Sequence, residues 1–240
     1  MGYSVDINAD IGEGYGRWHL GDDAGLLAVI SSANVACGFH AGDPTIMRRT
    51  CHLAADLGVN VGAQVGYPDL AGFGRRFIDI DPRELIDAVL YQVGALERLA
   101  LVEGTTVRYV KPHGALYNAI VHHEAQADAV VEALVAHGGG LPLLGLAGSM
   151  VEQAAATAGL RFVCEGFADR AYTASGTLVP RSEAGALLTD VDRVVAQARR
   201  LADGGVRSIC VHGDTPGATS LAAAVHHSLV SAGHIVEPFA

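Results

Sequence analysis

The hydrophobic positions of this chain follow two different periods. Short apolar runs rich in β-branched residues are typical of buried strands, and apolar residues every three or four positions are typical of helices. The strand-like runs cover residues 3–7, 33–37, 59–65, 106–110, 141–146, 161–164 and 206–211. Helix-like segments follow them at residues 22–31, after Asp43-Pro44, after Asp81-Pro82, and at residues 125–136, 149–158, 190–203 and 216–232.

Strands that alternate with helices in this way predict a parallel sheet. We expect a barrel rather than an open sheet. Polar residues follow nearly every strand, whereas an open sheet concentrates its site at one switch point. No composition break or linker divides the chain, so residues 1–240 are predicted to form a single irregular seven-stranded parallel β/α barrel domain.

Composition narrows the possible partners. The chain has 240 residues, a formal net charge of -10 and no run of Lys and Arg longer than two, which argues against nucleic-acid binding. No apolar stretch approaches 18 residues, so no membrane span is expected. The four cysteines form no C-x-x-C pair, and we expect reduced thiols and a cytoplasmic location.

The first three strands are each followed by candidate functional residues. Asn8, Asp10 and Glu13 offer oxygen donors for a metal or a substrate, although the same residue types also stabilise turns. His40 can act as a base or a metal ligand. The residues after the third strand that could contact a substrate are Gln64 and the pair Arg75 and Arg76, which can hold a carboxylate or a phosphate.

The later strands carry further candidates. Lys111 is the only lysine of the chain, and it precedes Pro112 and His113. After the sixth strand, Arg170 could anchor a carboxylate, and Asp169 could instead pair with it. The remaining candidates are Glu165 near the sixth strand and His212 and Asp214 after the seventh. We expect Thr215 to cap the following helix, which would free Asp214 for chemistry.

Several common signatures are missing from the sequence. The phosphate-binding motif G-x-x-x-x-G-K-[ST] is absent, because the single lysine is followed by proline. Neither a G-x-S-x-G elbow nor an H-E-x-x-H motif occurs. The candidate chemistry therefore depends on the whole set of polar groups expected at one rim of the barrel.

These groups, in this order, resemble the LamB/YcsF family over most of the chain. The matching segments are residues 31–44, 66–76, 111–118, 167–170 and 208–214. The resemblance implies an irregular β/α barrel related to carbohydrate deacetylases. It also implies ATP-dependent opening of 5-oxo-L-proline to L-glutamate, together with subunits B and C of a 5-oxoprolinase.

That activity suggests roles for the candidates. We expect Asp10, His40, His113 and Asp214 to activate water and protonate the leaving nitrogen. Arg170 or the arginine pair at 75–76 would hold the substrate carboxylate, and Lys111 would stabilise developing negative charge. Because a phosphate-binding loop is missing, ATP is expected to be handled with the partner subunits.

Two departures from the family stand out. The family usually reads Gly-Ala-His-Pro-Gly-Tyr-Pro-Asp, whereas this chain has Gln64 and Val65 in the third and fourth positions. Glutamine is a poor transition-metal ligand but can hydrogen-bond a substrate. The segment between Asp190 and Ser208 is also shorter than usual.

Two other functions are compatible with the sequence. One is a metal-dependent amide or carbohydrate deacetylase that needs no ATP, with a divalent metal held by Asp and His. The other is a non-catalytic subunit that binds a small acid, which the glutamine at position 64 makes easier to envisage. The metal content of the protein distinguishes the deacetylase from the ATP-dependent enzyme.

Overall fold

The structure is a computed structural model that describes residues 2–215 and 217–240. Seven parallel strands close into a barrel, because β1 pairs with both β2 and β7 and the strands between them pair in sequence order. This confirms the predicted barrel. The barrel strands are β1 (Ser4–Ile11), β2 (Ser32–Ala36), β3 (Asn60–Val65), β4 (Val107–Pro112), β5 (Leu143–Leu146), β6 (Phe162–Phe167) and β7 (Ser208–Cys210). An eighth short strand, β8 (Ile235–Val236), pairs with the beginning of β1.

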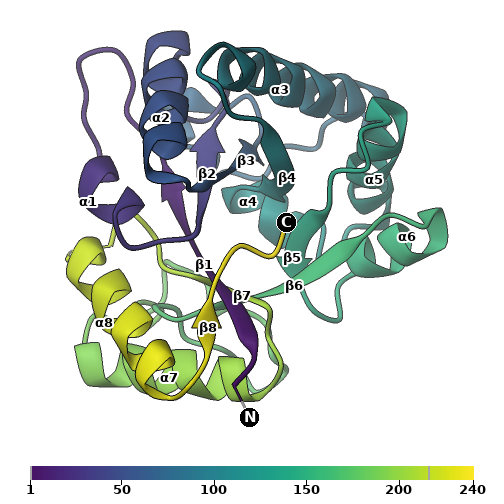
Figure 1. The fold of residues 1–240 in the computed structure, drawn as a ribbon. Coiled ribbons are helices and arrows are strands. Elements are labelled where there is room, and N and C mark those ends of the chain that lie inside the picture. The colour runs from purple at the N-terminus through teal and green to yellow at the C-terminus, as the bar shows by residue number, and fades with distance from the viewer. Residues whose placement is uncertain (1, 216) are drawn as a thin grey trace.

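Helices surround the barrel, as Figure 1 shows. Their apolar faces pack on the outward-facing residues of the strands in one large core. The helices are α1 (Asp23–Leu27), α2 (Pro44–Leu57), α3 (Pro82–Val102), α4 (Gly114–Ala119), α5 (Glu124–His137), α6 (Met150–Ala158), α7 (Val191–Asp203) and α8 (Ala218–Ser231), with the 3-10 turn η1 (Leu70–Gly72). No helix of the described residues is long and apolar enough to cross a membrane.

Most helix starts follow the expected chemistry. Asp43 accepts hydrogen bonds from the backbone of Thr45 and Ile46, which caps α2. The helix expected at residues 22–31 is shorter, because Ser31 already bonds to Ile7 in β1 and the chain is extended there. Pro216, the expected first residue of the last helix, lies outside the described residues.

Side chains of β1 alternate between the apolar core outside the barrel and the barrel interior, and those in the interior are polar. Val5, Ile7, Ala9 and Ile11 of β1 belong to the apolar core, and the alternate positions on the same strand are polar. Asp6, on that interior face, is fully buried and accepts hydrogen bonds from the hydroxyls of three serines, at positions 31, 32 and 208. Burial raises the pKa of Asp6 to about 6.

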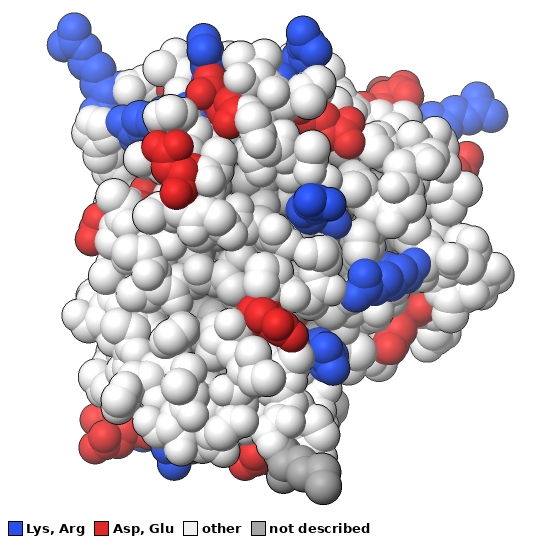
Figure 2. Space-filling view, viewed as in Figure 1, with Lys and Arg blue, Asp and Glu red and all other residues white. Residues whose placement is uncertain are grey.

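The carboxyl-terminal tail covers the amino-terminal end of the barrel. Phe239 packs against Tyr109 with 4.9 Å between ring centroids, and its carbonyl accepts a hydrogen bond from Arg161. In Figure 1 the tail crosses the barrel on the viewer's side. On the same face, acidic and basic side chains are interspersed and form no basic patch (Figure 2).

Candidate active site

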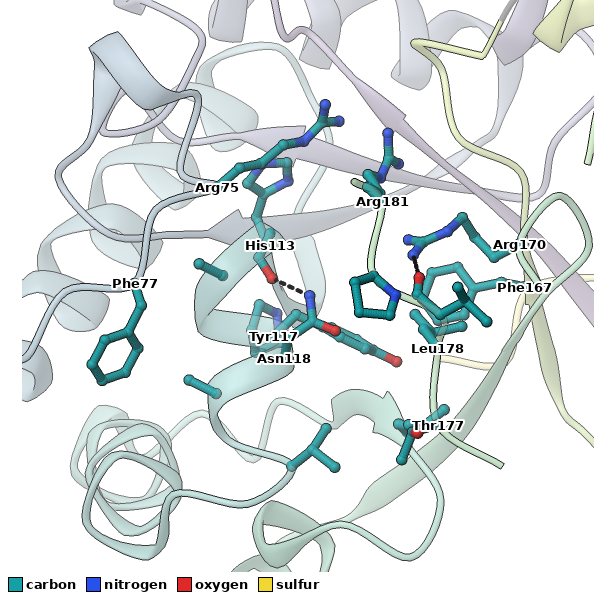
Figure 3. Close-up of a pocket in the computed structure, with 18 of the residues that line it drawn as sticks. Arg75, Phe77, His113, Tyr117, Asn118, Phe167, Arg170, Thr177, Leu178 and Arg181 are labelled. Carbon is teal, nitrogen blue, oxygen red and sulfur yellow. Dashed lines mark hydrogen bonds between the residues drawn. The ribbon is translucent and has the colours of Figure 1, made fainter. Parts of the chain in front are cut away.

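A cavity of about 630 Å³ lies at the carboxyl ends of the strands. In a β/α barrel this end carries the loops that differ between functions. Most of the lining residues come from β1, β4 and α4, from the loop after β3, and from the long loop after β6, and Leu146, Phe167 and His212 come from β5, β6 and the segment after β7. Figure 3 shows Arg75, Arg181 and Arg170 along one side of the cavity, with Tyr117 and Asn118 of α4 on another.

Lys111 forms the floor of the cavity. Its Nζ donates to Asn8 Oδ1 at 3.0 Å, to Glu165 Oε1 at 2.6 Å and to Cys210 Sγ at 3.2 Å. These contacts use all three donors of an ammonium group. Burial alone would lower the pKa of Lys111, but the neighbouring sulfur and carboxylates raise it well above its usual value, so the side chain stays charged.

Asp10 lies beside this lysine, with Oδ1 3.5 Å from Nζ. Burial would raise the pKa of Asp10, but the positive charge of Lys111 outweighs it, and the pKa falls below its usual value. Asn34 donates to Asp10 at 2.9 Å and to Asn8 Oδ1 at 2.7 Å. Asp10 is therefore an ionised carboxylate at the cavity floor.

Two predicted substrate contacts lie beneath the cavity instead of lining it. Asn8 donates to Ser208 Oγ at 2.8 Å and is fully buried. Glu165 is 3% exposed, and among the described residues its carboxylate accepts a hydrogen bond from Lys111 alone. Both residues sit inside the barrel and hold the lysine in place.

Two histidines stack on each other beside the floor. The rings of His40 and His113 have centroids 4.0 Å apart and planes within 9°. His113 Nε2 lies 2.9 Å from the carbonyl oxygen of Phe73, which can only accept, so this nitrogen carries the proton. Burial lowers the pKa of His40 to about 4 and, with help from His40, lowers the pKa of His113 well below its usual value.

The backbone next to the histidines is tightly constrained. Phe73 and Gly74 are successive left-handed residues, with φ of 55° and 64°. A Cβ on Gly74 would lie 2.7 Å from the Cβ of His40 and 2.9 Å from Cδ2 of His113. Glycine is therefore required here both for its conformation and for the close approach of the two rings.

Gln64 joins His40 to Glu13. Its Oε1 accepts from His40 Nε2 at 3.0 Å, and its Nε2 donates to Glu13 Oε1 at 3.3 Å. The glutamine is fully buried behind the cavity wall. Burial, followed by the charges of Asp10 and Asp214, raises the pKa of Glu13 well above its usual value. The pKa values of Glu13 and Asp10 are therefore shifted in opposite directions.

Glu13, His40 and His113 are the described residues that could hold a metal ion. Their ligand atoms lie within 4.8 Å of one another, and two imidazoles with a carboxylate suit a divalent transition metal. His113 fits this role, because its Nε2 is bound to a carbonyl and its Nδ1 lies 3.6 Å from Glu13. His40 fits in the same way, because its Nε2 donates to Gln64 and its Nδ1 is buried without a hydrogen-bond partner among the described residues.

Another histidine, His212, is held by a carboxylate. Asp169 Oδ1 lies 2.8 Å from His212 Nδ1, and Oδ2 accepts from the backbone N–H of His212 and from the hydroxyl of Thr215. Burial would raise the pKa of Asp169, but His212 and the hydrogen bonds hold it below its usual value. The expected capping role of Thr215 is wrong, because α8 has Gly217 at its N-cap and Thr215 serves Asp169 instead.

Asp214 pairs with two arginines. Its Oδ2 lies 2.5 Å from Arg75 Nη2 and 3.1 Å from Arg181 Nη1. Burial would raise the pKa of Asp214, but the two guanidinium groups hold it below its usual value. Asp214 does not line the cavity, whereas both arginines do. An acid–base role for Asp214 is therefore not supported by its surroundings.

Arg170 and Arg76 have separate structural contacts. Arg170 lines the cavity and donates to the carbonyls of Val179 at 2.6 Å and Ala186 at 3.3 Å, so it also holds the loop after β6. Arg76 forms an ion pair with Asp69, which is the N-cap of η1, and does not line the cavity. The two adjacent arginines at 75 and 76 thus point to different partners.

The predicted site residues fall into three groups. Six of them line the cavity: Asp10, Arg75, Lys111, His113, Arg170 and His212. Six contact those six from behind or below, namely Asn8, Glu13, His40, Glu165, Asp169 and Asp214, and Gln64 lies one step further back, against His40 and Glu13. Arg76 is the exception. Sequence reasoning missed Arg181, because it lies in an irregular loop far from any strand end.

Comparison with known proteins shows the family of this chain. A model of the LamB/YcsF family matches residues 5–240. The chain belongs to the LamB/YcsF family. Proteins from Kocuria rhizophila and Streptomyces coelicolor, each named as the A subunit of 5-oxoprolinase, are 57% identical to it, over 98% of this chain and 99% and 100% of theirs.

Solved structures show the same barrel fold. A lactam utilization protein from Thermus thermophilus superposes with a TM-score of 0.93 at 41% identity, over 98% of this chain and 100% of that one. A polysaccharide deacetylase from Bacillus cereus matches with a TM-score of 0.55 at 14% identity, over 99% of this chain and 92% of that one. The second likeness shows a shared fold.

Proposed function

We propose that this protein opens the lactam ring of 5-oxo-L-proline to give L-glutamate, as the A subunit of an ATP-dependent 5-oxoprolinase. Relatives that carry this name match along nearly the full length of the chain. The observation that carries the proposal is a cavity with a cationic wall, with Asp10 at its floor and Glu13 behind it, two carboxyl groups whose pKa values are shifted in opposite directions. Carboxyl groups whose pKa values are pushed apart are typical of an acid–base pair.

Ring opening needs activation, because a five-membered lactam is an unreactive amide. In the proposed sequence the lactam oxygen attacks the γ-phosphorus of ATP, and ADP leaves. Water then adds to the ring carbon, and the C–N bond breaks as the nitrogen takes up a proton, which gives γ-glutamyl phosphate. A second water releases phosphate, so one lactam, one ATP and two waters give glutamate, ADP and phosphate.

The residues of the cavity wall, and those directly behind it, suit the second half of this reaction, in which water adds and the ring opens. His212 is oriented by Asp169, so it can accept a proton from the attacking water. The raised pKa of Glu13 favours its protonated form, and its Oε1 lies 3.6 Å from His113 Nδ1, so this pair can supply the proton that the leaving nitrogen needs. Below them, Lys111 keeps Asp10 ionised.

The first half of the reaction, in which ATP phosphorylates the lactam oxygen, is assigned to the partner subunits B and C. The chain has no phosphate-binding loop, so we expect ATP to be bound and used mainly by its partners. The activated lactam would then enter the cavity of the present chain. Arg170 is the candidate to bind the substrate carboxylate, because it lines the cavity and is 5% exposed.

A metal-dependent deacetylase is the second candidate, favoured by the cluster of Glu13, His40 and His113. A divalent metal there would polarise an amide carbonyl and lower the pKa of a bound water. This candidate requires the purified protein to retain metal and to release acetate from an acetylated sugar without ATP. Loss of that activity on chelation would support it over lactam opening.

The decisive experiment is reconstitution. Glutamate release from 5-oxoproline is measured with this chain alone, with subunits B and C alone, and with all three, each with and without ATP. We expect glutamate from the complete mixture with ATP, and negligible glutamate from the chain alone. An Asp169→Asn chain serves as the matched inactive control, because it keeps the shape of the side chain but no longer holds His212 as a base. Full activity of the isolated chain would refute the division of labour.

A further inference from the structure

Two arginines from separate loops meet at the cavity wall. Arg75 follows η1 in the loop after β3, and Arg181 lies in the loop after β6. Both guanidinium groups contact Asp214, Arg75 at 2.5 Å and Arg181 at 3.1 Å. One carboxylate therefore holds together two cations that would otherwise repel each other.

Most donors of these arginines remain free. A guanidinium group has five N–H donors. Among residues 2–215 and 217–240, Asp214 is the only hydrogen-bond acceptor for the side chains of Arg75 and Arg181. Arg75 and Arg181 line the cavity, and Asp214 does not. The two guanidinium groups therefore lie between the carboxylate and the cavity, with donors left for a ligand.

A third cation adds to the charge of this wall. The pKa of Arg170 is lowered by burial and next by the charges of Arg181 and Arg75, which places all three within electrostatic reach of one another. Figure 3 shows the three side chains along one side of the cavity. The protein as a whole carries a formal charge of -10, so this positive wall is a local feature that favours anions.

We propose that Arg75 and Arg181 form a clamp for the phosphoryl group of an activated, phosphorylated lactam. Two guanidinium forks match the oxygens of a phosphoryl group, and a bare lactam carries a single carboxylate that Arg170 alone can bind. The cavity of about 630 Å³ has room for the larger, phosphorylated form. This assignment of the substrate rests on the proposed function.

The first test uses the chain alone, with inorganic phosphate as the probe. Calorimetry should show phosphate binding that weakens at least tenfold in Arg75→Gln and in Arg181→Gln. Arg193→Gln is the matched control, since it removes one exposed arginine on α7, away from the cavity. Equal weakening in the control, no weakening in the clamp variants, or acetate competing as well as phosphate would overturn the clamp.

The second test uses the reconstituted enzyme and measures ADP and glutamate together. If the phosphoryl group is held poorly, water displaces phosphate and returns 5-oxoproline, so ATP is used without product. Arg181→Gln should therefore raise the ratio of ADP to glutamate above that of the unmodified chain, and an unchanged ratio would contradict the proposal. Absence of turnover in every mixture, with phosphate binding intact, would refute the proposed function and leave the anion clamp standing.

Discussion

His40 and His113 are stacked face to face, 4.0 Å apart between ring centroids. Two imidazolium rings could not occupy this arrangement in a buried site, because their charges would repel without solvent to screen them. Both pKa values lie below the usual range for histidine, so both rings are neutral at neutral pH. The pair can therefore take up and release a proton without starting from a charged state.

Loss of the His113 side chain should affect both activity and stability. His113→Ala should abolish glutamate formation and lower the free energy of unfolding by about 2–3 kcal/mol, because the ring is buried, stacked and bonded to the carbonyl of Phe73. Urea denaturation measures the stability, with the exposed His227→Ala as control. An active, fully stable His113→Ala protein would exclude it from the site.

Stability should depend on pH through His40. The pKa of His40 is about 4 in the folded protein and near 6.5 when unfolded, so between these values the unfolded chain binds the extra proton. Stability must therefore fall as the pH falls from 6.5 toward 4, by at most about 1.4 kcal/mol per pH unit from this site.

The matched variant for this prediction is His40→Gln, which retains a group that can bond to Gln64 but cannot titrate. The raised pKa of Asp6 makes stability fall as the pH rises over nearly the same range, which opposes the effect of His40. Asp6 is present in both proteins, so the difference between their stability curves reports the titration of His40. Urea denaturation at several pH values provides the comparison. Parallel stability curves for the two proteins would show that His40 does not titrate in this way.

The hydrophobic pattern predicted the barrel, but it placed several strand ends too early. The run expected to end at residue 7 continues to Ile11, and the one expected to end at residue 110 continues to Pro112. Asp10 and Lys111 look like loop residues in the sequence because they are polar. They are strand residues that face the barrel interior, where ion pairs and hydrogen bonds satisfy them.

Arg181 shows what the sequence could not reveal. It lies in an irregular segment between β6 and α7, where no apolar period fixes its position. Its place in the cavity depends on Asp214, which is 33 residues further along the chain. Arg170 also fixes this loop, through carbonyls of Val179 and Ala186. Such long-range contacts leave no local signal.

Replacing Lys111 should reveal a buried ion pair. Lys111→Met leaves Glu165 buried without its cation, and such a change typically costs about 3–5 kcal/mol. Adding Glu165→Gln should recover a large part of this loss, because the remaining group is then neutral. A double-mutant cycle in urea gives the coupling energy. Additive effects of the two substitutions would argue against the pair.

The adjacent arginines at 75 and 76 should behave differently. Arg75→Gln should raise the ratio of ADP to glutamate in the reconstituted assay by about tenfold or more, because it removes a charged donor that holds the phosphoryl group of the activated lactam at the cavity wall. Arg76→Gln should leave this ratio nearly unchanged and act mainly on the loop that it ties to Asp69. Parallel assays of ADP and glutamate for both variants provide the measurement. Equal changes in the ratio would contradict the assigned geometry.

The last prediction concerns Gln64, which stands where the family usually has histidine. Gln64 accepts from His40 and donates to Glu13, and a neutral imidazole also offers one acceptor and one donor. If position 64 serves to orient its neighbours, Gln64→His should keep both contacts and change the rate by less than about tenfold, or 1.4 kcal/mol of barrier.

If histidine at this position binds metal, the variant would gain a third imidazole beside Glu13, His40 and His113 and should retain a divalent ion. The rate assay is therefore combined with elemental analysis of both purified proteins. Asp10, His113 and His212 already provide charged and proton-accepting groups at the cavity, so we expect the small change in rate without bound metal. A larger gain in rate, or metal held by the variant and not by the unmodified protein, would show that the glutamine replaces a ligand or a base.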